Sequence, residues 1–226
     1  MESSAPCPLV LAPIELSGVH RRFGPVPALA EIDLRFEAAT LTLVTGPNGA
    51  GKSTLLRLLA GLLRPTAGTI RYAGRPAGRL DAPAARAYLG HPTQLYGDLT
   101  VGENLALAAD LRRLPRGRIQ PWLERFDLGA VVDRPVLACS RGQAQRAALA
   151  RTFLGDPSLV LLDEPTAGLD ARGVLALRET LAALLRRGAA VVLATHDPTP
   201  LAQLAGRVVR LSAGRLVADE PTGGTP

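Results

Sequence analysis

Cysteine is scarce in this chain of 226 residues, which contains only Cys7 and Cys139. The two cysteines have neither the spacing of a metal site nor that of a redox motif, and a single pair does not make a disulfide framework. A disulfide-stapled secreted scaffold is therefore excluded, and a reducing compartment such as the cytoplasm is expected.

Long hydrophobic runs are also missing. Although 47% of the residues are hydrophobic, Gly, Pro and Arg interrupt them, and no run approaches the ~20 residues of a membrane-spanning helix. The first residues, "MESSAPCPLVLAP", begin with an acid and have no basic region, so we do not expect a cleaved signal peptide. The length suits one good core, or a core with a small subdomain.

Lysine is the rarest charged residue, because Lys52 is the only lysine among 26 basic residues. It lies in "GPNGAGKST", which matches the pattern G-x-x-x-x-G-K-[ST] of a phosphate-binding loop. Arginine is a planar fork, whereas lysine is a compact charge on a flexible stem that fits beside a phosphate in a tight backbone loop. The predicted nucleotide-binding residues are Gly46, Pro47, Asn48, Gly49, Ala50, Gly51, Lys52, Ser53 and Thr54, with Ser53 also a Mg²⁺ ligand.

The flanking sequence has the context that this loop requires. Residues 41–45 are short, apolar and β-branched, as in a buried strand, and leucines at helical spacing follow the loop and stop before Pro65. A helix that begins at the loop adds the attraction of its N-terminus for anions.

Strand and helix patterns alternate along the chain, which predicts an α/β fold. The segment 92–135 differs, because "VGENLALAADLRRL" and "QPWLERF" are helical in pattern. We therefore expect one domain, 1–226, with an ATP-binding core of residues 1–91 and 136–220, a helical subdomain of residues 92–135 and a flexible tail of residues 221–226. The net charge of +6 comes from scattered arginines, which favours a solvated surface, and no nucleic-acid partner is expected.

Acids and a histidine follow two further strand patterns. In "SLVLLDEPTAGLD" the apolar residues 159–162 precede Asp163 and Glu164, and in "AAVVLATHDP" residues 190–195 precede His196. Strand ends of a parallel sheet meet beside the phosphate loop. We expect Asp163 to hold Mg²⁺, Glu164 to polarise the attacking water, and His196 to bind a γ-phosphate or to hold that water.

A second anion site is predicted in "CSRGQAQRAALAR", where Ser140 is a favourable N-cap for a helix over residues 144–153. The loop, Lys52 and a metal already serve one γ-phosphate. The second site is therefore expected to serve a nucleotide held by another copy of the chain.

With these motifs in this order, the chain resembles the ATP-binding cassette (ABC) family over nearly its whole length. The resemblance identifies Walker A at 46–53, the signature at 139–143, Walker B at 159–163 followed by Glu164, the D-loop at 167–170, and His196 as the switch histidine. It implies a Mg²⁺-dependent ATPase with a mostly parallel central sheet, an N-terminal antiparallel β part and an inserted helical subdomain. It also implies an ATP-dependent head-to-tail homodimer, with further nucleotide contacts from Phe23, Ser140, Gly142, Gln143 and Asp170, of which Phe23 would stack on adenine.

The signature departs from the family pattern Leu-Ser-Gly-Gly-Gln at two positions. Cys139 replaces the leucine, and as a small hydrophobe it is a tolerable replacement. Arg141 replaces the first glycine and adds positive charge near the phosphates.

The Q-loop departs more sharply. The family pattern places a glutamine eight residues before the leucine of "LTVGENL", and that position is His91, whereas the nearest glutamine is Gln94. Either His91 acts at the metal and the water, or the loop is rearranged and Gln94 performs this role.

The stretch "YLGH…LTVGENL", together with the phosphate loop, is similar to the ATPase subunit of the haem-handling exporter of cytochrome c maturation. With no membrane-spanning run, a transport role requires separate integral membrane permease subunits. Their expected contact is around residues 96–105, where Tyr96 and Leu99 either are exposed anchors or simply pack the subdomain. The similarity implies a membrane partner complex and a peripheral position on the cytoplasmic face of the inner membrane. ATP turnover would then drive release of a haem-loaded chaperone. The alternatives are the ATPase of a drug or lipid exporter, and a soluble iron–sulfur assembly ATPase.

Overall fold

The computed structural model describes residues 11–76 and 85–224. The expectation about the signal peptide concerns residues 1–10 in large part. It therefore lies outside the described residues, as do Cys7 and the last two residues of the expected tail.

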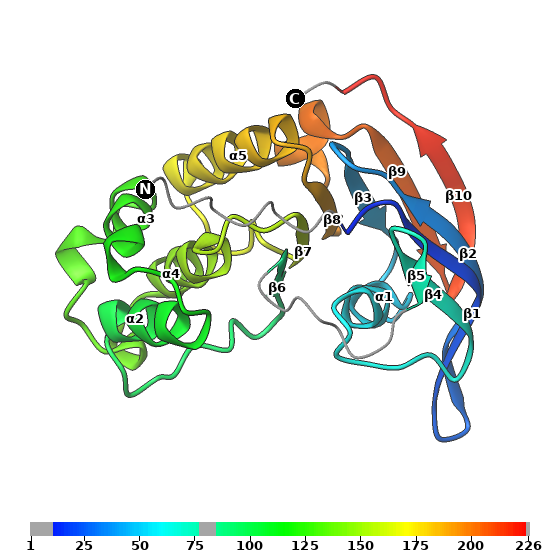
Figure 1. The fold of residues 1–226 in the computed structure, drawn as a ribbon, viewed down its shortest axis with the longest axis horizontal. Helices are drawn as coiled ribbons and strands as arrows, with labels where there is room; N and C mark the ends of the chain where they lie inside the picture. Colours follow the sequence, from blue (N-terminus) through cyan, green and yellow to red (C-terminus); the bar gives the residue numbers. More distant parts are fainter. Residues whose placement is uncertain (1–10, 77–84, 225–226) are drawn as a thin grey trace, which may run out of the picture.

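A six-stranded sheet forms the centre of the fold (Figure 1). Its strand order is β10-β9-β3-β8-β7-β6, in which all neighbours run parallel except β10, which is antiparallel to β9 at one edge. The strands are β3 (Leu41–Thr45), β6 (Arg86–Leu89), β7 (Leu159–Asp163), β8 (Ala190–Ala194), β9 (Arg207–Ser212) and β10 (Arg215–Pro221).

Both faces of this sheet are buried. Leu159 and Leu161 of β7 pack toward α1 (Lys52–Leu59), whereas Val160 and Leu162 pack toward the cluster that includes α5 (Ala171–Arg186). A strand covered on both sides needs apolar side chains in both directions, which is why these strands are near-continuous apolar runs. The strands expected at 41–45, 159–162 and 190–195 are confirmed to within one residue.

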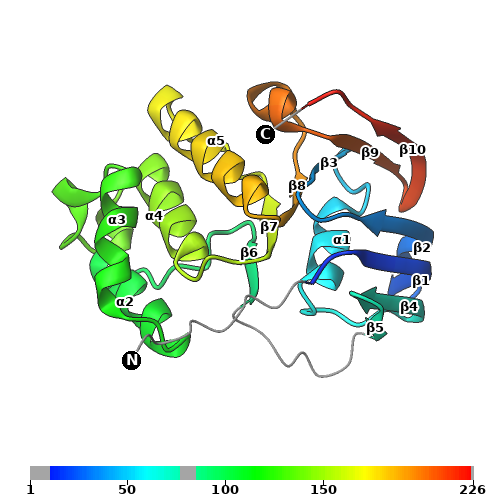
Figure 2. The same cartoon turned by 45° about the horizontal axis from the view of Figure 1, so that its top comes forward.

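A second, antiparallel sheet covers the far side of α1, so that this helix lies between two sheets (Figure 2). Its order is β2-β1-β4-β5, with β1 and β2 forming a hairpin. The strands are β1 (Ile14–Phe23), β2 (Val26–Phe36), β4 (Ala67–Tyr72) and β5 (Arg75–Pro76). The expected α/β class with an antiparallel N-terminal part is confirmed.

The helical region lies beside the β7–β6 edge of the central sheet and contains three helices: α2 (Val101–Leu111), α3 (Ile119–Arg125) and α4 (Arg141–Phe153). Trp122, Phe126 and Phe153 stack in its core, with 6.2 Å between the ring centres of the two phenylalanines. Because α4 packs against α2 and α3, this region includes residues up to 153, beyond the boundary expected at 135. Single-turn 3₁₀ helices connect its parts at η2 (Arg116–Arg118), η3 (Gly129–Val131) and η4 (Val136–Ala138), and η5 (Thr199–Leu204) follows β8.

The end of the chain differs from the expected flexible tail. Strand β10 includes Pro221, and the backbone N–H of Thr222 donates to the carbonyl of Gly206 at 2.9 Å. The first residues of the segment 221–226 are therefore attached to the edge of the central sheet. Within the described part of the chain, none of the helices has the length and apolar character needed to cross a membrane.

Candidate nucleotide-binding site

The loop between β3 and α1 is packed so tightly that two of its glycines admit no side chain. A Cβ on Gly46 would lie 2.1 Å from the carbonyl oxygen of Leu211, and a Cβ on Gly51 would lie 2.7 Å from that of Ala28. Both glycines have positive φ, 140° and 101°, which other residues rarely adopt. The loop backbone therefore forms a cradle of the kind that approaches phosphates closely.

Lys52 opens α1 and is 8% exposed. Its ammonium Nζ donates to the carbonyls of Gly46 at 2.7 Å and Pro47 at 3.1 Å, so the charge is held over the loop by backbone dipoles. Neither of these hydrogen bonds is to a carboxylate. The arrangement keeps a buried cation available for an anion that enters the loop.

Asp163, at the end of β7, is 5% exposed and hydrogen-bonds Ser53 at the start of α1. Burial raises the pKa of the Asp163 carboxyl, and the hydrogen bond with Ser53 offsets part of that rise. A carboxylate and a hydroxyl side by side are hard oxygen ligands of the type that Mg²⁺ accepts. Among the described residues, no group of three or more His, Cys, Asp or Glu side chains has the arrangement of a metal site.

Glu164 is turned back toward the end of β8. Its φ of 49° is in the left-handed region, and its N–H donates to the carbonyl of Ala194 at 2.9 Å. The backbone N–H of His196 donates to Oε1 at 2.9 Å, the hydroxyl of Thr195 donates to Oε2 at 3.1 Å, and His196 Nδ1 lies 2.9 Å from Oε2. The glutamate predicted to polarise the water and the histidine predicted to bind a γ-phosphate or hold that water are thus in direct contact.

Sequence reasoning missed Thr195. It is 1% exposed and fixes the orientation of the Glu164 carboxylate through its hydroxyl. The sequence signal that could have identified Thr195 is its position, because this hydroxyl residue directly follows a buried strand and directly precedes the predicted functional histidine.

A pocket of about 310 Å³ joins these elements, and the sequence-predicted residues that line it are Asn48, Gly49, Ala50, Gly51, Lys52, Ser53, Thr54, His91, Asp163 and Glu164. Ala28, from β2, also lines it, and no sequence signal pointed to this residue. A hollow of about 480 Å³ is lined by Asn48, His91, Arg141, Glu164, Ala167 and His196. The two cavities share Asn48, His91 and Glu164. His196 and Arg141, which line the hollow, therefore lie next to the phosphate-loop pocket.

The Q-loop alternatives differ in position. His91 lines the phosphate-loop pocket. Gln94 instead lines a groove with Tyr88, Tyr96 and Arg112, and its carbonyl accepts from Arg151 at 2.6 Å. The structure therefore brings His91, and not Gln94, to Asp163 and Glu164.

The signature residues Ser140, Gly142 and Gln143 do not line the phosphate-loop pocket, whereas Arg141 lines the neighbouring hollow. Ser140 and Gln143 form a reciprocal capping box at the start of α4. Ser140 is therefore the N-cap of this helix, as predicted. A Cβ on Gly142 would lie 2.7 Å from the carbonyl of Gly168, so the signature helix touches the D-loop. Asp170 caps α5 by accepting from Gly173 at 2.8 Å.

Phe23 lies at the end of β1, in the hairpin with β2, and is 45% exposed. Its ring carries the guanidinium of Arg21 at 4.6 Å from the ring centre. The structure places it outside the set of residues that line the phosphate-loop pocket. An exposed ring is free to offer its other face to a planar base.

This phosphate cradle, with buried Lys52, a Ser53–Asp163 pair and the Glu164–His196 contact, defines a P-loop ATPase. The chain belongs to the ABC transporter family, whose model matches residues 29–167.

Curated relatives come from several kinds of transport system. The chain is 41% identical over 209 residues to the sulfate/thiosulfate import ATP-binding protein CysA 2 of Chromobacterium violaceum, covering 90% of this chain and 57% of that protein. It is 38% identical to the daunorubicin resistance ATP-binding protein DrrA3 of Streptomyces coeruleorubidus, covering 91% and 67%. It is 43% identical over 171 residues to the cytochrome c biogenesis ATP-binding export protein CcmA of Gluconobacter oxydans, covering 75% and 74%.

Solved structures agree with this family. The dimeric structure of MJ0796, a bacterial ABC transporter cassette, has a TM-score of 0.84 at 26% identity and covers 93% of this chain and 99% of that one. A dimeric structure of the same cassette in a post-hydrolysis state, bound to ADP and Pi, has the same TM-score. The family of the chain is thus one of ATP-hydrolysing cassettes.

We predict that Asp163→Asn stabilises the nucleotide-free protein. Folding disfavours the ionised Asp163 carboxyl, because burial raises its pKa above the ordinary value of 3.8. The unfolded chain therefore ionises first, and stability is lost as the pH rises above 3.8. Removing the acid is expected to gain on the order of 0.5–2 kcal/mol at pH 7, or about 2–4 °C per kcal/mol in Tm by calorimetry.

The gain from Asp163→Asn is expected to shrink as the pH is lowered toward 3.8. Asp98→Asn is the matched control, because Asp98 is an exposed acid on a surface loop. A lower Tm for Asp163→Asn than for the unmodified protein at pH 7 would contradict the prediction.

Proposed function

We propose that the chain is the ATP-hydrolysing motor subunit of a membrane transporter, and that this transporter handles haem in cytochrome c maturation. The motor assignment is carried by one observation, the convergence of Lys52, Asp163 and the Glu164–His196 contact on the phosphate-loop pocket. The haem assignment is supported by the similarity of the stretch "YLGH…LTVGENL", which includes His91, and by the 43% identity to the cytochrome c biogenesis relative.

The phosphates of ATP would lie in the loop 46–54, with the loop N–H groups and the start of α1 directed at them. Lys52 would exchange its two backbone carbonyl partners for the β- and γ-phosphate oxygens. Ser53 and Asp163 would hold Mg²⁺, which neutralises charge on the phosphate oxygens when it is bound. Phe23 would stack on the adenine.

Glu164 is proposed to accept a proton from the attacking water. Thr195 and the backbone N–H of His196 hold its carboxylate in one orientation, which leaves the direction of proton transfer fixed. The imidazole of His196 and the ammonium of Lys52 would stabilise the charge that develops on the γ-phosphate. Losing one preorganised donor of this kind costs about 3–4 kcal/mol in the barrier.

The signature would complete the site of a second copy. Within one chain, Ser140, Gly142 and Gln143 lie outside the residues that line the phosphate-loop pocket. The N-terminus of α4 would face the γ-phosphate held by the other copy, and Asp170 would lie beside the interface between the two copies. A head-to-tail dimer with two ATP molecules follows, and the dimeric structures of the similar cassette support it.

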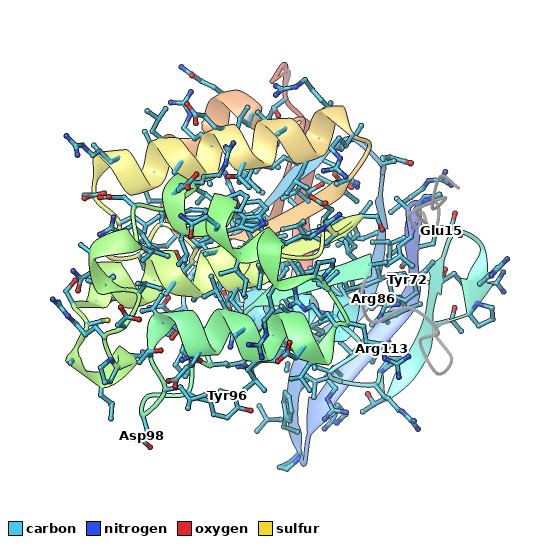
Figure 3. The ribbon with its side chains drawn as sticks, turned by 60° about the vertical axis from the view of Figure 1, so that its left-hand side comes forward. Glu15, Tyr72, Arg86, Tyr96, Asp98 and Arg113 are labelled. Carbon is cyan, nitrogen blue, oxygen red and sulfur yellow. The ribbon has the colours of Figure 1, made fainter. Side chains whose placement is uncertain are left out.

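A permease would dock at the groove beside the Q-loop. This groove of about 370 Å³ lies between the loop and α2, and it is lined in part by Gln94, Tyr96 and Leu111. Tyr96 is 59% exposed and lies with Asp98 at the outer edge of the helical region (Figure 3). The short segment from His91 to Tyr96 would connect the docked permease with the γ-phosphate. Such docking would hold the chain on the cytoplasmic face of the inner membrane.

For Glu164→Gln we expect retained ATP binding, hydrolysis slowed by about 10²-fold or more, and an ATP-dependent dimer. The amide keeps the shape of the carboxylate but cannot accept the proton. Analytical ultracentrifugation with ATP measures the dimer. Lys52→Ala is the control, because it removes the phosphate-binding cation and is expected to stay monomeric. A Glu164→Gln protein that remains monomeric with saturating ATP would argue against the sandwich.

For the Q-loop we expect His91→Ala to lower the ATP turnover number by about tenfold, as loss of one hydrogen bond of about 1–1.5 kcal/mol would. Gln94→Asn is expected to change it by less than about twofold, because Gln94 faces the docking groove and Asn tolerates its φ of 56°. A larger effect at Gln94 than at His91 would transfer the role to Gln94.

The transport role is tested by purifying Glu164→Gln with ATP from its native membranes. We expect integral membrane proteins to copurify together with haem absorbance in the Soret region. Permeases without haem would overturn the haem assignment. They would favour a drug or lipid exporter, or an import system; drug-resistance and import ATPases occur among the relatives. Soluble scaffold proteins alone would overturn the transport role and favour an iron–sulfur assembly ATPase.

A further inference from the structure

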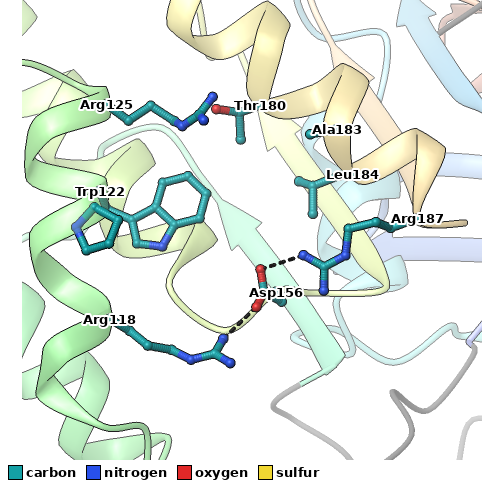
Figure 4. Close-up of a pocket in the computed structure, with 9 residues that line it drawn as sticks. Arg118, Trp122, Arg125, Asp156, Thr180, Ala183, Leu184 and Arg187 are labelled. Carbon is teal, nitrogen blue, oxygen red and sulfur yellow. Dashed lines mark hydrogen bonds and ion pairs between the residues drawn. The ribbon is translucent and has the colours of Figure 1, made fainter.

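A further cavity lies beside the helical region, and none of its described lining residues lines the phosphate-loop pocket. It has a volume of about 330 Å³ and lies between α3 and α5 (Figure 4). Its walls are apolar at Pro121, Trp122, Ala183 and Leu184. The reaction proposed above uses none of these residues.

Trp122 forms a rigid wall of this cavity. Its indole ring stacks within the helical region on Phe126 and Phe153, with ring centres 6.3 and 5.7 Å apart. Figure 4 shows the ring between Arg118 and Arg125, with Leu184 across the opening. A fixed aromatic surface of this kind favours a planar apolar partner over a flexible one.

The rim of the cavity has an excess of positive charge. Arg118, Arg125 and Arg187 line it, and among the described lining residues the only acid is Asp156. Asp156 is already engaged, because its two oxygens bind Arg118 at 2.5 Å and Arg187 at 2.9 Å. Within the described part of the chain, the one ion-pair partner of Arg125 is distant: Glu179, at 3.9 Å. Arg125 is therefore the guanidinium with most capacity to bind a further anion, in the paired geometry that guanidinium offers to carboxylate or phosphate.

We propose that this cavity binds a small planar aromatic molecule that carries one anionic group. The ring lies against Trp122 and Leu184, and the anion pairs with Arg125. Stacking on an aromatic face and a charge-assisted hydrogen bond at the rim supply recognition at opposite ends of the ligand. The site is independent of the transported substrate and of the ATP reaction.

The test uses Trp122 as its own reporter, since it is the only tryptophan in the chain. The ¹⁵N-labelled full chain, saturated with Mg-ADP to occupy the nucleotide site, gives one indole Nε1–H resonance. Benzoate is titrated against it, with benzamide as the uncharged analogue and acetate as the anion without a ring. We expect a saturable shift with benzoate at about 1–10 mM, as befits so small a ligand, and no saturable shift with either control.

Substitutions of Arg125 test whether this residue binds the carboxylate of benzoate. Arg125→Gln is expected to raise the dissociation constant of benzoate at least fivefold. Arg125→Lys keeps the charge but loses the paired geometry, so it is expected to raise the dissociation constant by less than Arg125→Gln does. Both are expected to fold, because the Arg125 side chain is 42% exposed. Arg113→Gln is the matched control, since it removes an exposed arginine from outside the cavity and leaves binding unchanged.

Three results would overturn the proposal. One is an indole resonance that does not move even when the benzoate concentration is 50-fold above the range in which saturation is expected. Another is an equal, saturable shift with benzamide or acetate. The third is benzoate binding by Arg125→Gln that equals binding by the Arg113→Gln control. None of these results bears on the motor assignment, which Glu164→Gln tests separately.

Discussion

The close packing of backbone around the phosphate loop is the constraint on which the rest of the structure depends. Gly46 lies against the carbonyl of Leu211, and Gly51 lies against that of Ala28. Hydrogen bonds continue the same contact, because Gly214 N–H donates to Ala50 O and Ala30 N–H donates to Gly214 O. The turn between β9 and β10 thus joins the antiparallel sheet to the loop. The two sheets keep their relative positions at the place where the nucleotide would be held.

The end of β7, at Asp163 and Glu164, illustrates a conflict between folding stability and the proposed chemistry. Asp163 is buried at a position where its charge is disfavoured, and Glu164 has a left-handed backbone conformation that costs a non-glycine residue on the order of 1 kcal/mol. The surrounding structure holds both, through Ser53 for the aspartate and through Thr195 and His196 for the glutamate. Residues chosen for folding alone would avoid both features.

The phosphate loop and three strands of the central sheet, at 41–45, 159–162 and 190–195, could be predicted because their patterns are local. A contiguous strand, glycine loop and leucine-rich helix locate Lys52, and a polar residue directly after an apolar strand locates Asp163 and His196. Other features depend on contacts between distant segments. The choice between His91 and Gln94 depends on the path of the chain after β6, where Arg151 of α4 binds the carbonyl of Gln94. The place of α4 depends on ring stacking between Trp122 and Phe153, which no local pattern encodes.

The solitary lysine has a consequence for the chemical modification of this protein. Acylating agents and lysine-modifying enzymes act on side-chain amines, and the chain offers only Lys52, which is 8% exposed and folded onto its own loop. The other basic side chains are guanidiniums, which remain charged and resist acylation under the same conditions. The cationic surface is therefore inert to regulation by lysine acetylation. A label that attaches to a side-chain amine therefore reports on the opening of the phosphate loop itself.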